Sequence, residues 1–134
     1  MTPTLSGRWQ SRLLLLGSLG ALISFGFALI FNSVIPLILL AVVIFLGLIW
    51  DIFYDKIQQR RWDHDWPPAF QLLAGVFEGL FIFGLLQIVP LPGIPNAFQF
   101  WAHYTAVWVV TFLASQSVMR LFFPRWRFNG GVWL

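Results

Sequence analysis

Four long apolar stretches take up most of this chain, and they limit its possible folds more than any other feature does. A helix that crosses the roughly 30 Å of hydrocarbon in a bilayer needs about 20 apolar residues, because each residue advances it by about 1.5 Å. Residues 13–31, 34–54, 68–89 and 97–119 have this length and character. The sequence therefore predicts an all-α integral membrane protein, in which four transmembrane helices form one compact domain over residues 1–134.

The composition agrees with a protein of the membrane. Hydrophobic residues make up 59% of the chain and charged residues 10%, whereas soluble domains have about 25% charged residues. There is no cysteine, which excludes disulfides, cysteine-ligated zinc and a cysteine nucleophile. The net charge of +3 comes from basic residues that flank the apolar stretches. We interpret them as determinants of membrane topology and expect no binding of nucleic acid.

The basic residues all fall on one side of the predicted bundle. The connections on the other side, between the first and second stretches and between the third and fourth, carry no charge. Because basic residues stay on the cytoplasmic side of a membrane, we expect both termini there, in a bacterial inner or thylakoid-type membrane. Residues 120–134 mix arginine with large aromatics, which favours a tail lying at the membrane surface. The basic residues are Arg8, Arg12, Lys56, Arg60, Arg61, Arg120, Arg125 and Arg127.

The first apolar stretch has a second possible interpretation. Two arginines, an apolar run and the small residues around Gly26 and Ala28 loosely resemble a signal peptide with its cleavage site. The apolar run continues through Phe31, however, and is longer than the roughly 7 to 15 residues of a signal peptide core. This length favours an uncleaved membrane anchor.

Small residues define one face of the first stretch. On a helical wheel Gly17, Ala21, Ser24 and Ala28 lie close together. Small side chains at this spacing let two membrane helices approach closely. We therefore expect the first helix to pack against the others through this face.

Glu78 lies near the middle of the third stretch, with Gln71 on the same helix face, and His103 and Gln99 lie on the fourth. Placing a charge in the bilayer centre is costly, so such residues find partners or serve function. Because no basic residue falls inside a predicted stretch, we expect a protonated Glu78 that bonds to Gln71, Gln99 or His103. It acts either as a structural link between helices or as a proton-coupling group. His103 could alternatively ligate haem or chlorophyll, but the sequence offers no second ligand for such a group. We therefore predict no cofactor.

Seven charged residues surround the connection between the second and third stretches. Carboxylates with an imidazole can hold a divalent metal, but basic residues are interleaved here, which is typical of a solvated surface network. We predict no metal. Asp51 differs from the rest because it falls at or just inside the membrane boundary. The group comprises Asp51, Asp55, Arg60, Arg61, Asp63, His64 and Asp65.

The expected function class follows from the catalytic motifs that the sequence lacks. The sequence holds no nucleophile elbow, phosphate-binding glycine loop or HExxH pattern, so we predict a protein that is not an enzyme. The expected function is that of an accessory or assembly subunit in a larger membrane complex, with the bilayer and other membrane subunits as partners. The alternative is a small proton-coupled transporter or channel that works as a parallel homo-oligomer. A more remote third reading is a lipid-handling enzyme that uses Asp51 and Asp55.

Overall fold

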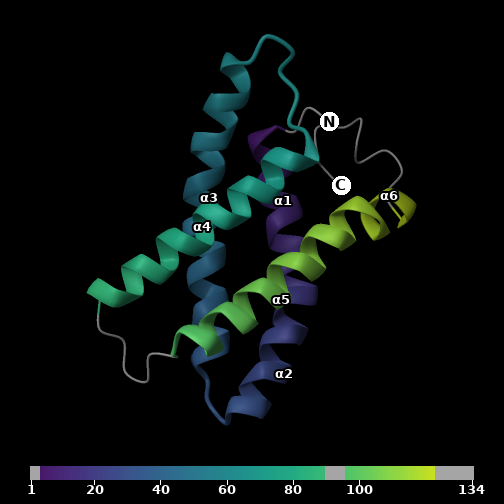
Figure 1. The fold of residues 1–134 in the computed structure, drawn as a ribbon. Coiled ribbons are helices and arrows are strands. Elements are labelled where there is room, and N and C mark those ends of the chain that lie inside the picture. The colour runs from purple at the N-terminus through teal and green to yellow at the C-terminus, as the bar shows by residue number, and fades with distance from the viewer. Residues whose placement is uncertain (1–3, 90–95, 123–134) are drawn as a thin grey trace.

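The computed structural model describes residues 4–89 and 96–122, and every regular element in these ranges is helical (Figure 1). The predicted all-α class is confirmed. The predicted surface tail lies outside the described residues from residue 123 onward. The elements are α1 (Leu5–Leu15), η1 (Leu16–Gly20), α2 (Ala21–Phe31), α3 (Ile35–Arg60), α4 (Pro68–Ile88), α5 (Ala97–Gln116) and α6 (Val118–Phe122).

Within the described residues, three helices are long and apolar enough to cross a membrane. They are the continuous helix Leu5–Phe31, formed by α1, η1 and α2, together with α3 and α4. The helix α5 is not among them, although we predicted a span there. Its mean hydropathy is reduced by polar residues such as His103 and Thr111, which are buried inside the bundle. Its exposed side carries apolar residues such as Val109 and Leu113.

The first helix begins eight residues before the predicted span. Thr4 caps it, because its side chain accepts a hydrogen bond of 3.1 Å from the backbone N–H of Gly7. The helix then continues through the polar residues around Arg8 and Arg12, which are good helix formers. Hydropathy locates only the apolar part of a helix, so it missed this start. The consequence is that Arg12 lies within a helix that is long enough to span.

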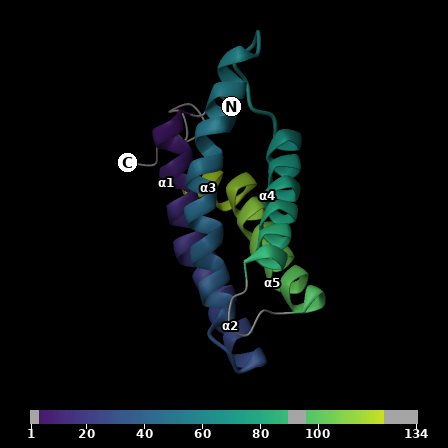
Figure 2. The same ribbon diagram turned by 90° about the vertical axis from the view of Figure 1, so that its left-hand side faces the viewer.

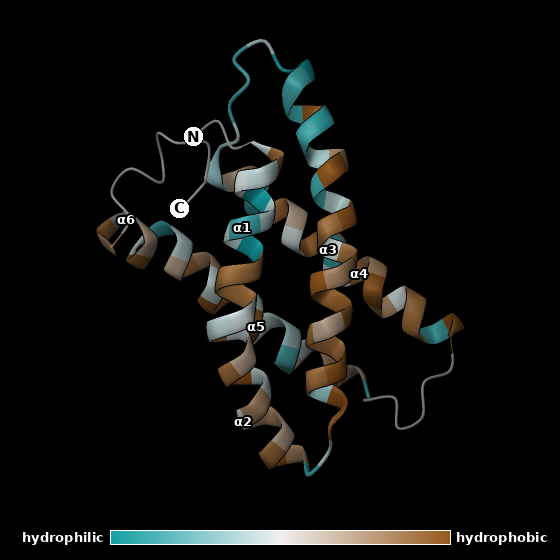
Figure 3. Cartoon of the chain, turned by 180° about the vertical axis from the view of Figure 1, so that it is seen from behind, coloured by the Kyte–Doolittle hydropathy of each residue, from teal (hydrophilic) through white to brown (hydrophobic). Residues whose placement is uncertain are grey.

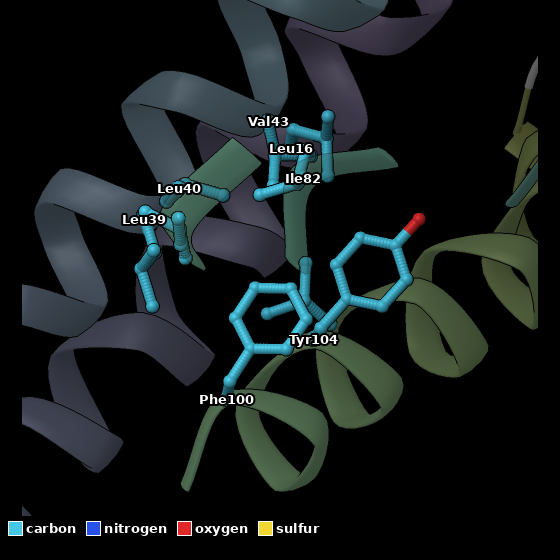
Figure 4. Packing of buried hydrophobic residues seen from close by; sticks show 9 residues of the cluster. Leu16, Leu39, Leu40, Val43, Ile82, Phe100 and Tyr104 are labelled. Carbon is cyan, nitrogen blue, oxygen red and sulfur yellow. The ribbon is translucent and has the colours of Figure 1, made fainter. Parts of the chain in front are cut away.

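The helices form two layers (Figures 1 and 2). The first helix and α3 run antiparallel in one layer, and α4 and α5 cross them in the other. The layers are held by a cluster of buried apolar side chains, in which Leu39, Ile82 and Phe100 are almost completely enclosed (Figure 4). The whole cluster is Leu16, Leu39, Leu40, Val43, Ile82, Leu86, Phe100, Tyr104 and Val107.

A π-helical turn, η1, interrupts the first helix and changes which residues face the bundle. A π turn is wider than an α turn, so residues four apart stay on one side across it. Leu16, Gly20 and Ser24 are buried accordingly. Gly17, which the helical wheel placed on the packing face, is exposed, whereas Ala21 and Ala28 are partly buried. The close approach therefore occurs at Gly20, where an added Cβ would lie 3.1 Å from Leu40.

Hydrophilic residues gather at one end of the molecule (Figure 3). This polar end contains the start of α1, the last turns of α3 and the connection at residues 61–67. The rest of the outer surface is largely apolar and includes exposed side chains such as Leu22, Phe45 and Phe77. Exposed apolar side chains of this kind are compatible with helices that are surrounded by lipid.

Candidate functional site

Arg12 makes four hydrogen bonds to carboxylate oxygens in the interior of the molecule. Its Nε and Nη2 atoms donate to the two carboxylate oxygens of Asp51, both at 2.9 Å. Its Nη1 and Nη2 atoms donate to the two carboxylate oxygens of Glu78, at 3.0 and 3.1 Å. One guanidinium thus holds two carboxylates in the bidentate geometry that arginine favours. We call these three residues the Arg12 cluster.

The Arg12 cluster connects three helices and is largely shielded from solvent. Arg12 lies in α1, Asp51 in α3 and Glu78 in α4. The side chains of Asp51 and Glu78 are 4% and 6% exposed, and that of Arg12 is 17% exposed. A buried charge needs a partner and hydrogen bonds. The cluster provides both, and its three formal charges sum to one negative charge.

A glycine in α3 makes room for the Arg12 guanidinium. A Cβ atom at Gly47 would overlap the guanidinium group of Arg12. Gly47 lies four residues, or about one helical turn, before Asp51 on the same helix. The α3 helix therefore supplies both the space and one of the carboxylates.

Two glycines in α4 have a similar role toward aromatic side chains of α5. A Cβ atom at Gly75 would overlap the indole of Trp108, and one at Gly79 would press against the ring of Tyr104. The hydroxyl of Tyr104 donates a hydrogen bond of 2.5 Å to the backbone carbonyl of Gly75. These contacts seat the helix that carries Glu78 against α5.

A cavity of about 250 Å³ lies against the Arg12 cluster. Its walls come from α1, α3, α4 and α5, and the connection before α4 adds Trp66. Tyr54, Tyr104 and Trp108 give it aromatic walls, and Val43 and Val107 add aliphatic ones. Charged groups and aromatic surface therefore face the same space.

Arg8 also lines this cavity, one helical turn before Arg12. Its Nη2 atom donates a hydrogen bond of 2.5 Å to the side-chain oxygen of Gln58. Its guanidinium carbon lies 4.5 Å from the centre of the Trp66 ring, within the range of a cation–π contact. Gln58 in turn donates to the backbone carbonyl of His64 at 2.8 Å. Arg8 is thereby linked to the connection between α3 and α4.

His103 lies away from the Arg12 cluster. Its Nε2 atom is 2.8 Å from the hydroxyl oxygen of Ser24, and both residues are buried. The Phe27 ring packs edge-on against its imidazole, with 5.5 Å between ring centres. His103 and Gln99 line a second cavity of about 160 Å³, together with residues around the α2–α3 connection.

The structure thus separates the four polar residues that we expected together. Glu78 and Gln71 line the first cavity, and His103 and Gln99 line the second. Glu78 is bonded to Arg12, which we had placed outside the spans. Both of its carboxylate oxygens accept hydrogen bonds, as an ionised carboxylate does. We therefore replace the expectation of a protonated Glu78 with that of an ion-paired one.

The predicted charged group is also divided. Asp51 belongs to the Arg12 cluster, whereas Arg61 and Asp63 form a separate ion pair at 3.1 Å. The hydrogen bond from Arg61 and the one from the backbone N–H of Asp65 hold the pKa of Asp63 below its usual value. Asp55 accepts a hydrogen bond from Gln59 at 2.7 Å.

Two further members of that group are exposed. They are Arg60, in the last turn of α3, and His64, whose backbone φ of 51° lies in the left-handed region. Within residues 4–89 and 96–122, no group of three or more histidine, aspartate or glutamate side chains is arranged to hold a metal ion.

Sequence reasoning missed Arg12 as a site residue. The signal was present, because a carboxylate inside a span needs a cationic partner, and Arg12 directly precedes the first apolar stretch.

Comparisons with protein-family models, curated proteins and solved structures gave no match.

Proposed function

We propose that this chain is an integral membrane protein with four transmembrane helices and both termini on the cytoplasmic side. We further propose that it works as a non-enzymatic accessory or assembly subunit of a larger membrane complex. The main support is the contrast between its interior and its outer faces. The charges of the Arg12 cluster are paired within the chain, whereas the outer surface of α4 is apolar over Leu73, Phe77 and Leu80.

Outward-facing glycines are the specific observation in favour of packing against the helices of a partner protein. Gly17 in η1 and Gly84 in α4 are exposed, and a Cβ atom at either would meet open space. Membrane helices associate through small residues that allow their backbones to approach closely. A glycine that contacts nothing within its own chain is therefore available to a second helix.

Purification in mild detergent at native abundance tests this proposal. We expect a stoichiometric complex that is larger than the chain and contains other membrane proteins. Gly17→Leu and Gly84→Leu should release the chain from this complex without changing its own melting temperature, because both side chains would point outward. Recovery of the chain alone, at every detergent concentration that preserves known membrane complexes, would contradict the accessory role.

A small proton-coupled transporter or channel, working as a parallel homo-oligomer, is the second candidate. It is supported by the two cavities, one beside Glu78 and one beside His103. Side chains of the apolar cluster line both cavities: Tyr104 and Val107 line the first, and Leu39 lines the second. In this reading Glu78 exchanges a proton when its bond to Arg12 breaks, and His103 relays it. Purification as a homo-oligomer alone, with pH-dependent transport in proteoliposomes that Glu78→Gln abolishes, would favour this candidate.

A further inference from the structure

Arg8 and Arg12 line the same cavity, but their bonding differs sharply. Arg12 donates to four carboxylate oxygens. Within the described part of the chain, the hydrogen bond from the Arg8 side chain goes to the neutral amide of Gln58. The Nε atom of Arg8 is buried as well as unpaired. A buried donor without a partner is destabilising, and most such groups in proteins are paired.

The packing of Arg8 suits binding of an oxyanion. The Trp66 ring covers one face of the guanidinium, which leaves the N–H groups at the edge of the plane to bind acceptors. Within the part of the chain that the structure describes, no carboxylate forms an ion pair with Arg8. Carboxylate and phosphate groups match the planar fork of arginine donors.

The shape of the cavity adds a requirement for an apolar group. Arg8 lines the cavity from the first turns of α1, whereas the walls farther along the chain are formed by Leu15 at the end of α1, Leu16 in η1 and Val107 in α5. An engineered apolar cavity of about 150 Å³ accommodates a benzene molecule. The present cavity of about 250 Å³ is larger. It therefore has room for a short alkyl chain or a small ring system behind the charged group.

We propose that this cavity binds an acidic amphiphile, whose carboxylate or phosphate group bonds to Arg8 and whose apolar tail lies between α1 and α5. The Arg12 cluster is a structural neighbour of this site, because the donors of Arg12 are used by Asp51 and Glu78. The ligand comes either from the anionic lipids of the bilayer or from a free acidic amphiphile. This inference does not depend on the accessory role, since it concerns a cavity within one chain.

Octyl phosphate is a suitable probe, added to the purified full chain in a neutral detergent. Native mass spectrometry reports occupancy, and the melting temperature reports stabilisation by the bound ligand. We expect octyl phosphate to bind, and octanol, octyltrimethylammonium and inorganic phosphate to bind far more weakly. Competition by phosphatidylglycerol would identify the bilayer lipid as the source. Its failure to compete, with octyl phosphate still bound, would identify a free amphiphile.

Two variants locate the site. Arg8→Gln should weaken binding of octyl phosphate by about tenfold or more, since hydrogen bonds to charged groups are the stronger ones. Arg60→Gln removes the same charge from an exposed position and should leave binding within about twofold. Leu15→Trp keeps Arg8, fills the cavity and should block binding. If Arg8→Gln fails to fold, as judged by circular dichroism, the binding measured for Leu15→Trp tests the proposed site.

Three results would overturn the proposal. The first is undiminished binding of octyl phosphate by folded Arg8→Gln or by Leu15→Trp. The second is tighter binding of octyltrimethylammonium, which would assign the cavity to cations that interact with Asp51 and Glu78. The third is equally tight binding of inorganic phosphate, which would leave the apolar walls without a role.

Discussion

Arg12 neutralises one of two carboxylates and hydrogen-bonds to both, so both carboxylates depend on Arg12. Moving charges out of water is costly, and their attraction repays this cost only when the geometry is good and the hydrogen bonds are complete. In this protein both carboxylates accept two bonds each from the guanidinium. The cluster therefore adds little net stability as a set, but removing Arg12 leaves two buried carboxylates without a cation.

Arg12→Leu should be the most damaging single change in the cluster. It leaves Asp51 and Glu78 buried together without a cation, and breaking a buried ion pair in this way costs about 3–5 kcal/mol. Glu78→Gln should be milder, because Arg12 then keeps a one-to-one pair with Asp51. Melting temperatures in detergent test this order.

Two control variants test the explanation of the stability lost in Arg12→Leu. Arg60→Leu removes an exposed arginine and should change the melting temperature little. Replacing Arg12, Asp51 and Glu78 together by leucine should restore most of the stability lost in Arg12→Leu, because it removes the unpaired charges. A triple variant that is less stable than Arg12→Leu would show that the cluster stabilises the fold by more than pairing its own charges.

The ionisation of Glu78 can be measured directly. Because both of its oxygens accept bonds from Arg12, we expect an ionised carboxylate at neutral pH. Infrared difference spectra between the wild type and Glu78→Gln should show the loss of a carboxylate band. Loss of a protonated carboxyl band instead would contradict the ion pair and return Glu78 to the neutral state that we first expected.

At the scale of the elements, the turn geometry of the first helix decides which residues pack. A helical wheel assumes a constant 100° per residue and placed Gly17 on the packing face. The π turn η1 breaks this assumption, so that Leu16 and Gly20 pack instead, while Gly17 is exposed. Sequence pattern has no reliable signal for a single π turn, because the residues of "LGSLG" are equally compatible with an α-helix.

The contact between α4 and α5 depends on glycine at position 75. A methyl group at this position would overlap the indole of Trp108, whereas one at Gly84 on the same helix would meet open space. Gly75→Ala should therefore lower the melting temperature, and overpacking of this kind typically costs about 1–3 kcal/mol. Gly84→Ala should be neutral or slightly stabilising, since alanine favours the helix more than glycine does.

Circular dichroism melts in detergent measure both effects. An equal change in melting temperature for the two variants would mean that the loss at position 75 reflects a general effect of alanine in α4. A rise in melting temperature for Gly75→Ala would mean that the Trp108 side chain moves away at little cost.

At the scale of the whole molecule, the sequence predicted the helices and their connections well, but it did not predict the links between them. Apolar length located the helices within a few residues, except at the start of α1 and the end of α3. Both of these ends lie in polar sequence that hydropathy does not register. The pairing of Arg12 with Glu78 joins residues 66 positions apart. Such a pairing depends on how the helices cross, which a pattern within each helix does not contain.

The distribution of basic residues predicts how the molecule lies in the membrane. The start of α1 and the 61–67 connection lie at the same polar end (Figure 3), and the connection on residues 32–34 lies at the opposite end of the first helix and α3 (Figure 1). The eight basic residues are on the first of these sides in the predicted topology. Since cytoplasmic segments carry an excess of lysine and arginine, this polar end should be cytoplasmic.

Reporter fusions after Ser33, His64, Asn96 and Leu134 test the topology. We expect cytoplasmic signals after His64 and Leu134 and external signals after Ser33 and Asn96. A cytoplasmic signal after Asn96 would mean that α4 does not cross the bilayer, and an external signal after Leu134 would mean that α5 does not cross it. An external signal after His64 would reverse the orientation of the whole molecule.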